Sequence, residues 1–309
     1  MMNKDEKNGE RTPWFSICTV TDTDQVDLDR LYGNLKEQSL QDFEWIIVGD
    51  GAPQAVRDEA SRIAAEADFP VVYLFQKKKG RAAALNRGLE EAKGRFFIVL
   101  DLGTRPVPDA LEKLAGHWKS IPEQERSYFV SVAGLVALND GTIYGSKFPS
   151  SPFDSNSIET STHYGVGGRK WGFLRTEVVR GEGFPVFQGE DFFPDQLVLN
   201  RIGQRAITRY VNDVVLILEK EEPPSRREEL RRWIENPKAS AKYYNEFSGM
   251  RLPLAHKVRA CANYVRYSMH AGVIPDDIFK AANKRLITFF MLWPGLIAYK
   301  RDRKKMRRV

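Results

Sequence analysis

The sequence predicts an α/β protein with a mostly parallel sheet flanked by helices and a helical C-terminal extension. Apolar runs alternate with helix-forming segments from Trp14 onward, a pattern typical of parallel strands joined by right-handed crossover helices. The runs are almost continuously apolar, as strands covered on both faces are. Acidic residues stand where two of these runs end, at Asp50 and Asp101.

The first half of the chain gives the clearest alternation. Strands are expected over 15–20, 44–50, 71–76 and 96–101, with helices over 27–39, 54–67 and 82–93 between them. A helix over 108–119 follows. The run FVSVAGLVAL and the segment IYGSKF, joined by NDGT, then predict an antiparallel hairpin. A glycine-rich stretch, a helix ending at Ile202 and the strand AITRYVNDVVLILE complete an α/β domain over 14–222, and a helical region is expected over 223–309.

The composition leads us to expect a cytoplasmic protein. The first residues, 1–13, are charged and lack an apolar core, so we expect a disordered leader and no signal peptide. Of the two cysteines, Cys18 lies in the apolar run WFSICTV and is expected to be a buried side chain. The four histidines have no metal-ligand spacing.

The net charge of +6 is concentrated at the C-terminus, in YKRDRKKMRRV. That position and the lack of a recognised binding module argue against a nucleic-acid binder. The preceding apolar run, from Leu286 to Tyr299, has about fourteen residues, too few to span a bilayer. Apolar and basic segments side by side predict a peripheral protein on the inner face of the cell membrane, separable by truncation after Asn283. The alternative is a packed C-terminal helix with a solvated basic tail.

The acidic residues suggest a ligand site. Carboxylates at the carboxyl edge of a parallel sheet lie where ligands bind, so Asp50 suits hydrogen bonding to a base or ribose. Asp101 suits ribose hydroxyls or a cation on a diphosphate, and Asp191, next to Glu190, suits removal of a proton from a hydroxyl group. A single aspartate after a strand is more often a turn former, so the prediction depends on the whole set.

The ordered motifs resemble those of a known family. FSICTVTDTD, WIIVGDGAP, KKKGRAAALNRGLEEAKGRFFIVLD, GFLRTEVVRGEGF and GEDFF, over about residues 14 to 215, are similar to the catalytic domain of inverting family 2 glycosyltransferases, which has the GT-A fold. The resemblance implies that Asp191 is the general base with Glu190 beside it. It also implies a set of residues that bind the nucleotide-sugar: Thr19, Asp50, Lys79, Arg81, Asn86, Asp101, Gly167 and Gly168.

One position departs from the family pattern. The resemblance makes Asp101 the metal ligand and favours Mg²⁺ or Mn²⁺, but Gly103 stands where the family usually has a second aspartate. Glycine has no side-chain ligand. The cation would then depend on Asp101, Thr104, water and the diphosphate, or basic residues would replace it.

A second, partial match follows in EKEEPPSRREELRRW, which resembles the region before the QxxRW motif of processive members. Glu229 stands where glutamine is expected, so the sequence favours a non-processive enzyme. Arg232 and Trp233 are assigned to the acceptor side, and the alternative is an amphipathic helix with Trp233 packed on the protein.

The resemblance therefore implies transfer of a sugar from a nucleotide-diphosphate donor, a UDP-sugar in the first instance, to a hydroxyl group of a glycan or polyprenyl-linked acceptor in polysaccharide biosynthesis. The alternative function is a catalytically impaired sugar-nucleotide-binding partner of a membrane glycan-assembly complex, which Gly103 motivates.

Overall fold

The computed structural model describes residues 12–22, 28–219 and 225–306. It divides into two compact units. Unit 1 comprises Met1–Asp154, Gly168–Gly183 and Thr208–Glu221, and unit 2 comprises Ser155–Gly167, Phe184–Ile207 and Glu222–Val309. This division differs from the predicted boundary at 222, because two segments expected in the α/β domain cluster with the C-terminal helices. Residues 1–11 of the expected leader lie outside the described residues.

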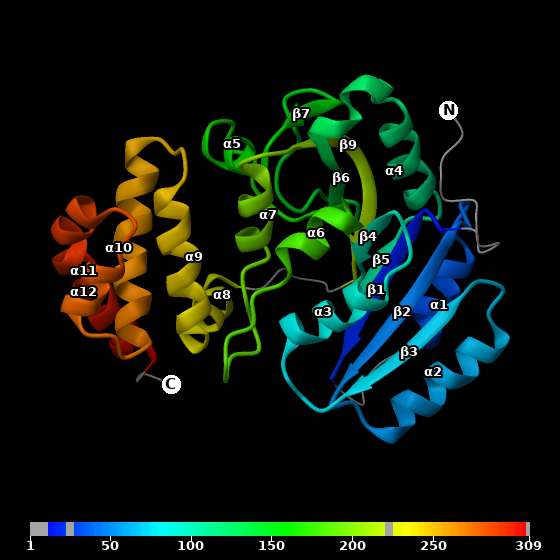
Figure 1. Cartoon of the computed structure of the whole chain (residues 1–309), viewed down its shortest axis with the longest axis horizontal. Helices are drawn as coiled ribbons and strands as arrows, with labels where there is room; N and C mark the ends of the chain where they lie inside the picture. Colours follow the sequence, from blue (N-terminus) through cyan, green and yellow to red (C-terminus); the bar gives the residue numbers. More distant parts are fainter. Residues whose placement is uncertain (1–11, 23–27, 220–224, 307–309) are drawn as a thin grey trace. The chain divides into compact units, whose positions relative to one another are not determined.

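A nine-stranded sheet forms the centre of unit 1, with the order β3-β2-β1-β4-β8-β6-β9-β5 and β7 paired to β9. Four parallel strands, neighbouring blue to cyan arrows in Figure 1, make up the first half of this order. The strands are β1 (Phe15–Thr21), β2 (Phe43–Asp50), β3 (Val71–Gln76), β4 (Phe96–Val99), β5 (Thr104–Pro106), β6 (Phe129–Leu138), β7 (Phe153–Ser155), β8 (Lys170–Arg175) and β9 (Ile207–Leu218). The predicted mostly parallel α/β architecture is confirmed for this half.

Helices cover the sheet because each buries an apolar stripe against it. They are α1 (Leu28–Lys36), α2 (Gln54–Glu66), α3 (Arg81–Glu91), α4 (Ala110–Lys119) and α6 (Thr176–Glu182), with a short 3₁₀ helix η2 (Glu123–Tyr128). Helix α3 lies very close to β1: a Cβ at Gly88 would come within 2.5 Å of the Cys18 sulfur. Cys18 is fully buried, and burial raises the pKa of its thiol to about 12.

The predicted hairpin after Asp101 is wrong in its second strand. Segment IYGSKF makes isolated bridges, Ala137 to Ile143 and Gly145 to Gly168, rather than a strand. The antiparallel partner of β6 is β8. The positive φ angles of Gly141 and Gly145, 82° and 119°, explain why the chain leaves the ladder so soon after the turn.

Unit 2 is helical. Its elements are α5 (Ser157–Thr162), α7 (Gln196–Gly203), α8 (Arg226–Glu235), α9 (Pro237–Gly249), α10 (Leu254–His270), α11 (Pro275–Ala281) and α12 (Arg285–Met306). An apolar cluster around Tyr264, Val265, Tyr267 and Ile278 holds the C-terminal helices together. The rings of Tyr244 and Tyr267 stack at 5.5 Å within it. The predicted helical C-terminal region is confirmed.

Helix α12 has one packed face and one exposed face. On the packed face, a Cβ at Gly295 would meet the Val265 side chain at 2.5 Å, and buried Asp302 pairs with Arg266 and His270 of α10. The exposed face carries Leu286, Phe289, Phe290, Trp293 and Ile297, which are 47–74% exposed. The packed face agrees with the alternative of a packed C-terminal helix, and membrane association stays a prediction. Because α12 packs on α10, truncation after Asn283 should destabilise unit 2.

Among the described helices, we find none whose length and apolar content would let it cross a membrane.

Candidate active site

The first predicted carboxylate, Asp50, ends β2 and is 2% exposed. Its Oδ1 accepts hydrogen bonds from Gln76 Nε2 at 2.7 Å and from the backbone N–H of Lys79 at 2.8 Å, and its Oδ2 accepts one from the backbone N–H of Gly80 at 2.8 Å. These bonds anchor the loop that leads into α3. The structure thus gives Asp50 a role in shaping the loop, beyond the predicted contact with a nucleotide.

The second carboxylate, Asp101, lies just beyond β4, at the carboxyl end of the parallel strands. Its Oδ1 is 2.7 Å from a guanidinium nitrogen of Arg81, the first residue of α3, and its Oδ2 pairs with Arg169, which precedes β8. Burial acts to raise the pKa of the Asp101 carboxyl, but the charges of the two arginines outweigh it and hold the pKa below its usual value. Asp101 is therefore an anion between two fixed cations.

The side chains around Asp101 do not fit a divalent cation. Both carboxylate oxygens are engaged by guanidinium groups, and Gly103, with a φ of 74°, brings no ligand. The Thr104 hydroxyl donates to the backbone oxygen of Asp101 at 2.6 Å. Within the described ranges, no cluster of three or more His, Cys, Asp or Glu residues suits a metal ion. Mg²⁺ and Mn²⁺ prefer carboxylate, carbonyl and water oxygens, which this set supplies poorly.

Three other residues predicted to bind the nucleotide-sugar occupy different surroundings. Lys79 is exposed and Asn86 is half-buried on α3, so both are open to a ligand. Thr19 is fully buried, and its hydroxyl accepts a hydrogen bond from Trp45 Nε1 at 3.0 Å. This hydrogen bond gives the Thr19 side chain a role in the core, and its contact with a nucleotide stays a prediction.

The two predicted loop glycines fall in different units. Gly167 belongs to unit 2 and has open space around its Cα, whereas Gly168 belongs to unit 1 and bridges to Gly145. A Cβ at Gly168 would come within 2.1 Å of the Tyr144 carbonyl oxygen, and its φ is 82°. Only glycine fits there. The tight bridge fixes the backbone immediately before Arg169.

Glu190, in unit 2, caps a helix. Its carboxylate accepts hydrogen bonds from the backbone N–H groups of Lys238 at 2.7 Å and Ala239 at 2.8 Å, in the first turn of α9. A negative charge at a helix N-terminus is stabilising. The backbone N–H of Phe192 donates to Asn236 at 3.1 Å, and Lys238 Nζ donates to the carbonyl of Gln188 at 2.9 Å. Segment 188–192 is therefore held on both sides of Asp191.

Asp191 itself is exposed. Its carboxylate makes no hydrogen bond or ion pair with any residue that the structure describes. It does not lie at a helix N-terminus, since α7 begins five residues later, at Gln196. A carboxylate on a fixed backbone and exposed to solvent is suited to accept a proton from a substrate.

The two residues predicted on the acceptor side lie next to the same segment. The Arg232 guanidinium lies 5.4 Å from the ring centre of Phe192, and the rings of Phe192 and Trp233 are 6.0 Å apart. Trp233 also packs on Tyr243, Tyr244 and Tyr267. This geometry favours the packing alternative for Trp233, while Arg232 remains exposed.

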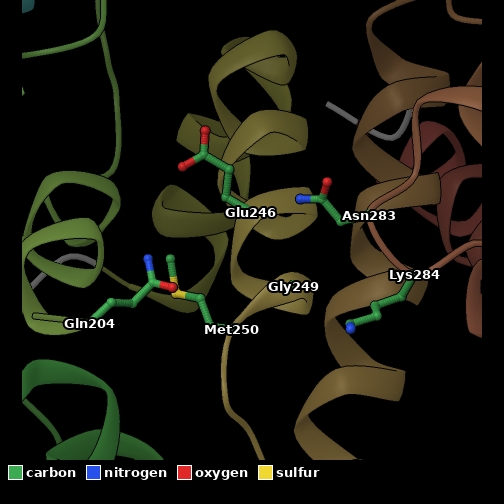
Figure 2. Close-up of a pocket in the computed structure, with 6 residues that line it drawn as sticks. All are labelled: Gln204, Glu246, Gly249, Met250, Asn283 and Lys284. Carbon is green, nitrogen blue, oxygen red and sulfur yellow. The ribbon is translucent and has the colours of Figure 1, made fainter.

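A shallow pocket of unit 2 contains none of the predicted residues (Figure 2). It is lined by Gln204, Glu246, Gly249, Met250, Asn283 and Lys284. Glu246 is paired with Arg201 at 2.7 Å and with Lys242 at 3.2 Å, so its charge is already balanced.

Sequence reasoning missed Arg169 altogether. The signal was a basic residue immediately after the paired glycines in GVGGRKW. Sequence alone does not connect it to Asp101, because 68 positions separate the two residues.

Comparison with known proteins finds matches to the first part of the chain. Residues 16–124 match the family described as "Glycosyl transferase family 2". The dolichol-phosphate mannosyltransferase of Pyrococcus furiosus is 28% identical over 102 residues, 32% of this chain and 28% of the relative. The putative glycosyltransferase EpsH of Bacillus subtilis is 29% identical over 103 residues, 33% of this chain and 30% of the relative. The matched region spans less than a third of either curated relative.

Solved structures share the fold over most of the chain. S. aureus TarS has a TM-score of 0.60 at 13% identity, covering 92% of this chain and 54% of TarS. TarS 1-349 in complex with UDP-GlcNAc gives 0.57 at 15% identity, covering 95% and 91%. The mannosyltransferase PcManGT from Pyrobaculum calidifontis, in complex with GDP-Man and Mn²⁺, gives 0.53 at 16% identity, covering 94% and 88%.

The fold is thus of the GT-A type, a Rossmann-like sheet with helices on its faces. Residues 16–124, which carry Asp50, Arg81 and Asp101, match the model of glycosyltransferase family 2.

Proposed function

We propose that this protein is an inverting, non-processive glycosyltransferase. It moves a sugar from a nucleotide-diphosphate donor, a UDP-sugar in the first instance, to a hydroxyl group of a glycan or lipid-linked acceptor in surface polysaccharide or glycoconjugate assembly. The observation that carries this function is Asp191, an exposed carboxylate on a segment held by Glu190 and Phe192. The family match over residues 16–124 and the nucleotide-sugar complexes of TarS and PcManGT support the choice of substrate class.

In this reaction Asp191 takes the proton of the acceptor hydroxyl group as its oxygen bonds to the anomeric carbon. The bond from that carbon to the diphosphate breaks, and the electron pair leaves with the diphosphate. Attack from the face opposite the leaving group inverts the configuration, and a single displacement needs no protein nucleophile. Use of Mg²⁺ or Mn²⁺ stays a prediction. The side chains around Asp101 do not favour it.

The second candidate is a sugar-nucleotide-binding partner of a membrane glycan-assembly complex without turnover, which Gly103 favours. Incubation with UDP-GlcNAc, UDP-glucose and GDP-mannose distinguishes the two candidates, since release of nucleoside diphosphate reports turnover. We expect release by the wild type, and a loss of about 10²-fold or more in Asp191→Asn with nucleotide affinity nearly unchanged. Binding without release in the wild type would favour the second candidate. If none of the three binds, both functions fail.

We also propose that unit 2 docks on an anionic membrane at the inner face of the cell membrane. The exposed residues of α12 recur at spacings of three and four, so they lie on one side of the helix. The last turn of the same helix carries Arg303, Lys304 and Lys305. An apolar stripe beside basic residues fits acyl chains and lipid phosphates together. A lipid-linked acceptor would then lie in the membrane on which unit 2 docks.

A further inference from the structure

We infer that Arg81 and Arg169 take up the negative charge of the leaving diphosphate, in place of a divalent cation. This inference depends on the proposed glycosyltransferase function, because it assigns the residues that receive its leaving group. It starts from the cluster in unit 1 where one carboxylate, Asp101, is paired with two guanidinium groups.

The charge of this cluster disfavours a metal and favours a phosphate. Two arginines against one aspartate leave a net charge of +1 around the carboxylate that would have to hold the cation. A dication brought to Asp101 would be repelled by both guanidinium groups and would have to displace them from the oxygens they occupy. A diphosphate brought to the same place meets a net positive charge, which attracts it.

The chemistry of arginine suits the leaving group. A guanidinium has five N–H donors in a planar fork that matches phosphate oxygens. The side chains of Arg81 and Arg169 are 29% and 33% exposed, so a ligand in solution reaches them. Hydrogen bonds from guanidinium to phosphate are charge-assisted and therefore stronger than neutral ones.

Both arginines are held in place by backbone features that precede them. Arg81 begins α3 directly after Gly80, whose N–H is bonded to Asp50. Arg169 follows Gly168, which is fixed in its bridge to Gly145. Asp101 then links the two side chains to each other. Groups fixed before the reaction stabilise developing charge without the cost of reorganisation.

The proposed step is balanced without a metal. The acceptor oxygen forms a bond to the anomeric carbon and gives its proton to Asp191. The bond between the anomeric carbon and the diphosphate oxygen breaks, and the electron pair stays on that oxygen. Arg81 and Arg169 stabilise the added charge by hydrogen bonds and by their positive charge, and neither transfers a proton.

The test is calorimetric titration of the full chain with UDP, UMP and GDP in excess EDTA and then in excess MnCl₂. For whichever of UDP and GDP binds, we expect the affinity in EDTA and the affinity in MnCl₂ to agree within about twofold. Arg81→Gln and Arg169→Gln should each weaken diphosphate binding about tenfold and reduce the preference for UDP over UMP. Arg62→Gln is the matched control, because Arg62 also pairs with two carboxylates, Asp29 and Glu66, on the surface of unit 1.

The outcomes distinguish failure of this inference from failure of the proposed function. Diphosphate binding that needs Mn²⁺, or that rises tenfold or more with it, overturns this inference and leaves the proposed function standing. Variants that melt like the wild type and bind UDP as well as it does also overturn the inference. Failure of UDP and GDP to bind in either condition overturns the proposed function itself. The metal comparison uses unaltered protein, so it decides the question even if a variant does not fold.

Discussion

The Glu190 carboxylate accepts a hydrogen bond from the backbone N–H of Lys238 at 2.7 Å and thereby joins the segment that carries Asp191 to the first turn of α9. The family pattern places an acidic pair here, and in this protein its two members have different surroundings. Glu190 is used by the fold, whereas Asp191 is left available for a substrate.

Replacing Glu190 with Gln should slow catalysis without weakening binding of the nucleotide-sugar. The amide has one acceptor oxygen and no charge, so the backbone N–H groups of Lys238 and Ala239 lose part of their cap and the Asp191 segment loosens. Misplacement of a reacting group by about 1 Å costs up to 10²-fold, so we expect kcat to fall roughly ten- to hundredfold. Steady-state kinetics and UDP titration measure the two effects. Glu235→Gln, which removes a surface ion pair on α8, is the control. An unchanged kcat would show that Glu190 does not position the base.

Replacing Asp50 with Ala should weaken nucleotide binding and destabilise unit 1. The backbone N–H groups of Lys79 and Gly80 would lose their acceptor, at about 1–3 kcal/mol for each buried group. The loop before Arg81 would loosen at the same time. Urea unfolding and UDP titration measure these effects, with Asp58→Ala on α2 as the control, because Asp58 accepts a hydrogen bond from an exposed side chain, that of Gln54. A stable variant with wild-type UDP affinity would contradict both roles.

The pair between Asp302 and Arg266 should make the stability of unit 2 depend on pH. Burial acts to raise the pKa of Asp302, but the hydrogen bonds and charges of His270 and Arg266 outweigh burial and hold the pKa below its usual value. A lowered folded-state pKa means that the stabilisation is fully present above the unfolded value of about 3.9 and is lost as the pH falls through the folded value. Asp302→Asn should therefore cost about 3 kcal/mol near neutral pH, and the difference from the wild type should shrink below about pH 4.

Thermal melting across this pH range is the measurement for Asp302. Asp276→Asn breaks an exposed pair with Lys280 at one helical turn and is the control, with an expected cost of about 0.3–0.5 kcal/mol. A constant difference between Asp302→Asn and the wild type from neutral to acid pH would rule out the linkage.

The exposed face of α12 should carry membrane binding. Changing both Phe290 and Trp293 to Gln removes large apolar side chains that are 63% and 74% exposed, so the fold should tolerate the change. We expect at least a tenfold loss of binding to anionic vesicles in flotation, since each buried aromatic side chain is worth about 1.5–3 kcal/mol. Leu254→Gln is the control, because Leu254 is equally exposed but begins α10. Wild-type flotation by the double variant would remove this face from the interface.

Salt should separate the two contributions to membrane binding. Raised ionic strength screens the attraction between Lys304, Lys305 and lipid phosphates but leaves the apolar contribution in place, so release of the intact protein should be partial. Complete release would indicate that only the basic residues act.

Much of unit 1 was predictable because local sequence determines it. Continuous apolar runs such as IIV in β2 specify strands buried on both faces, and their carboxyl ends place Asp50 and Asp101 correctly. The hairpin prediction failed in its second strand because the next segment pairs with the end of β6 only at Ala137 and Ile143. Strand β6 instead lies between β9 and β8, and β8 follows a long excursion into unit 2. Long-range pairing of this kind leaves no local pattern.

The candidate site was predictable in its carboxylates and not in their partners. The pairing of Asp101 with Arg169 and the capping of α9 by Glu190 connect residues 68 and 48 positions apart. Thr19 was assigned from a motif, but the sequence does not state which face of β1 it occupies or that Trp45 covers it. Motifs identify residue types, whereas burial and hydrogen bonding depend on the tertiary fold.

The burial of both cysteines has a practical consequence for following the protein by fluorescence. Cys18 lies under α3, and Cys261 is buried in α10, so neither thiol faces solvent in the native state. The high pKa of Cys18 keeps it protonated and unreactive towards maleimides near neutral pH. A single cysteine introduced at an exposed position such as Lys79 would then take up a dye selectively, without prior replacement of either native thiol. The native background thus already serves for site-specific spectroscopy of nucleotide binding.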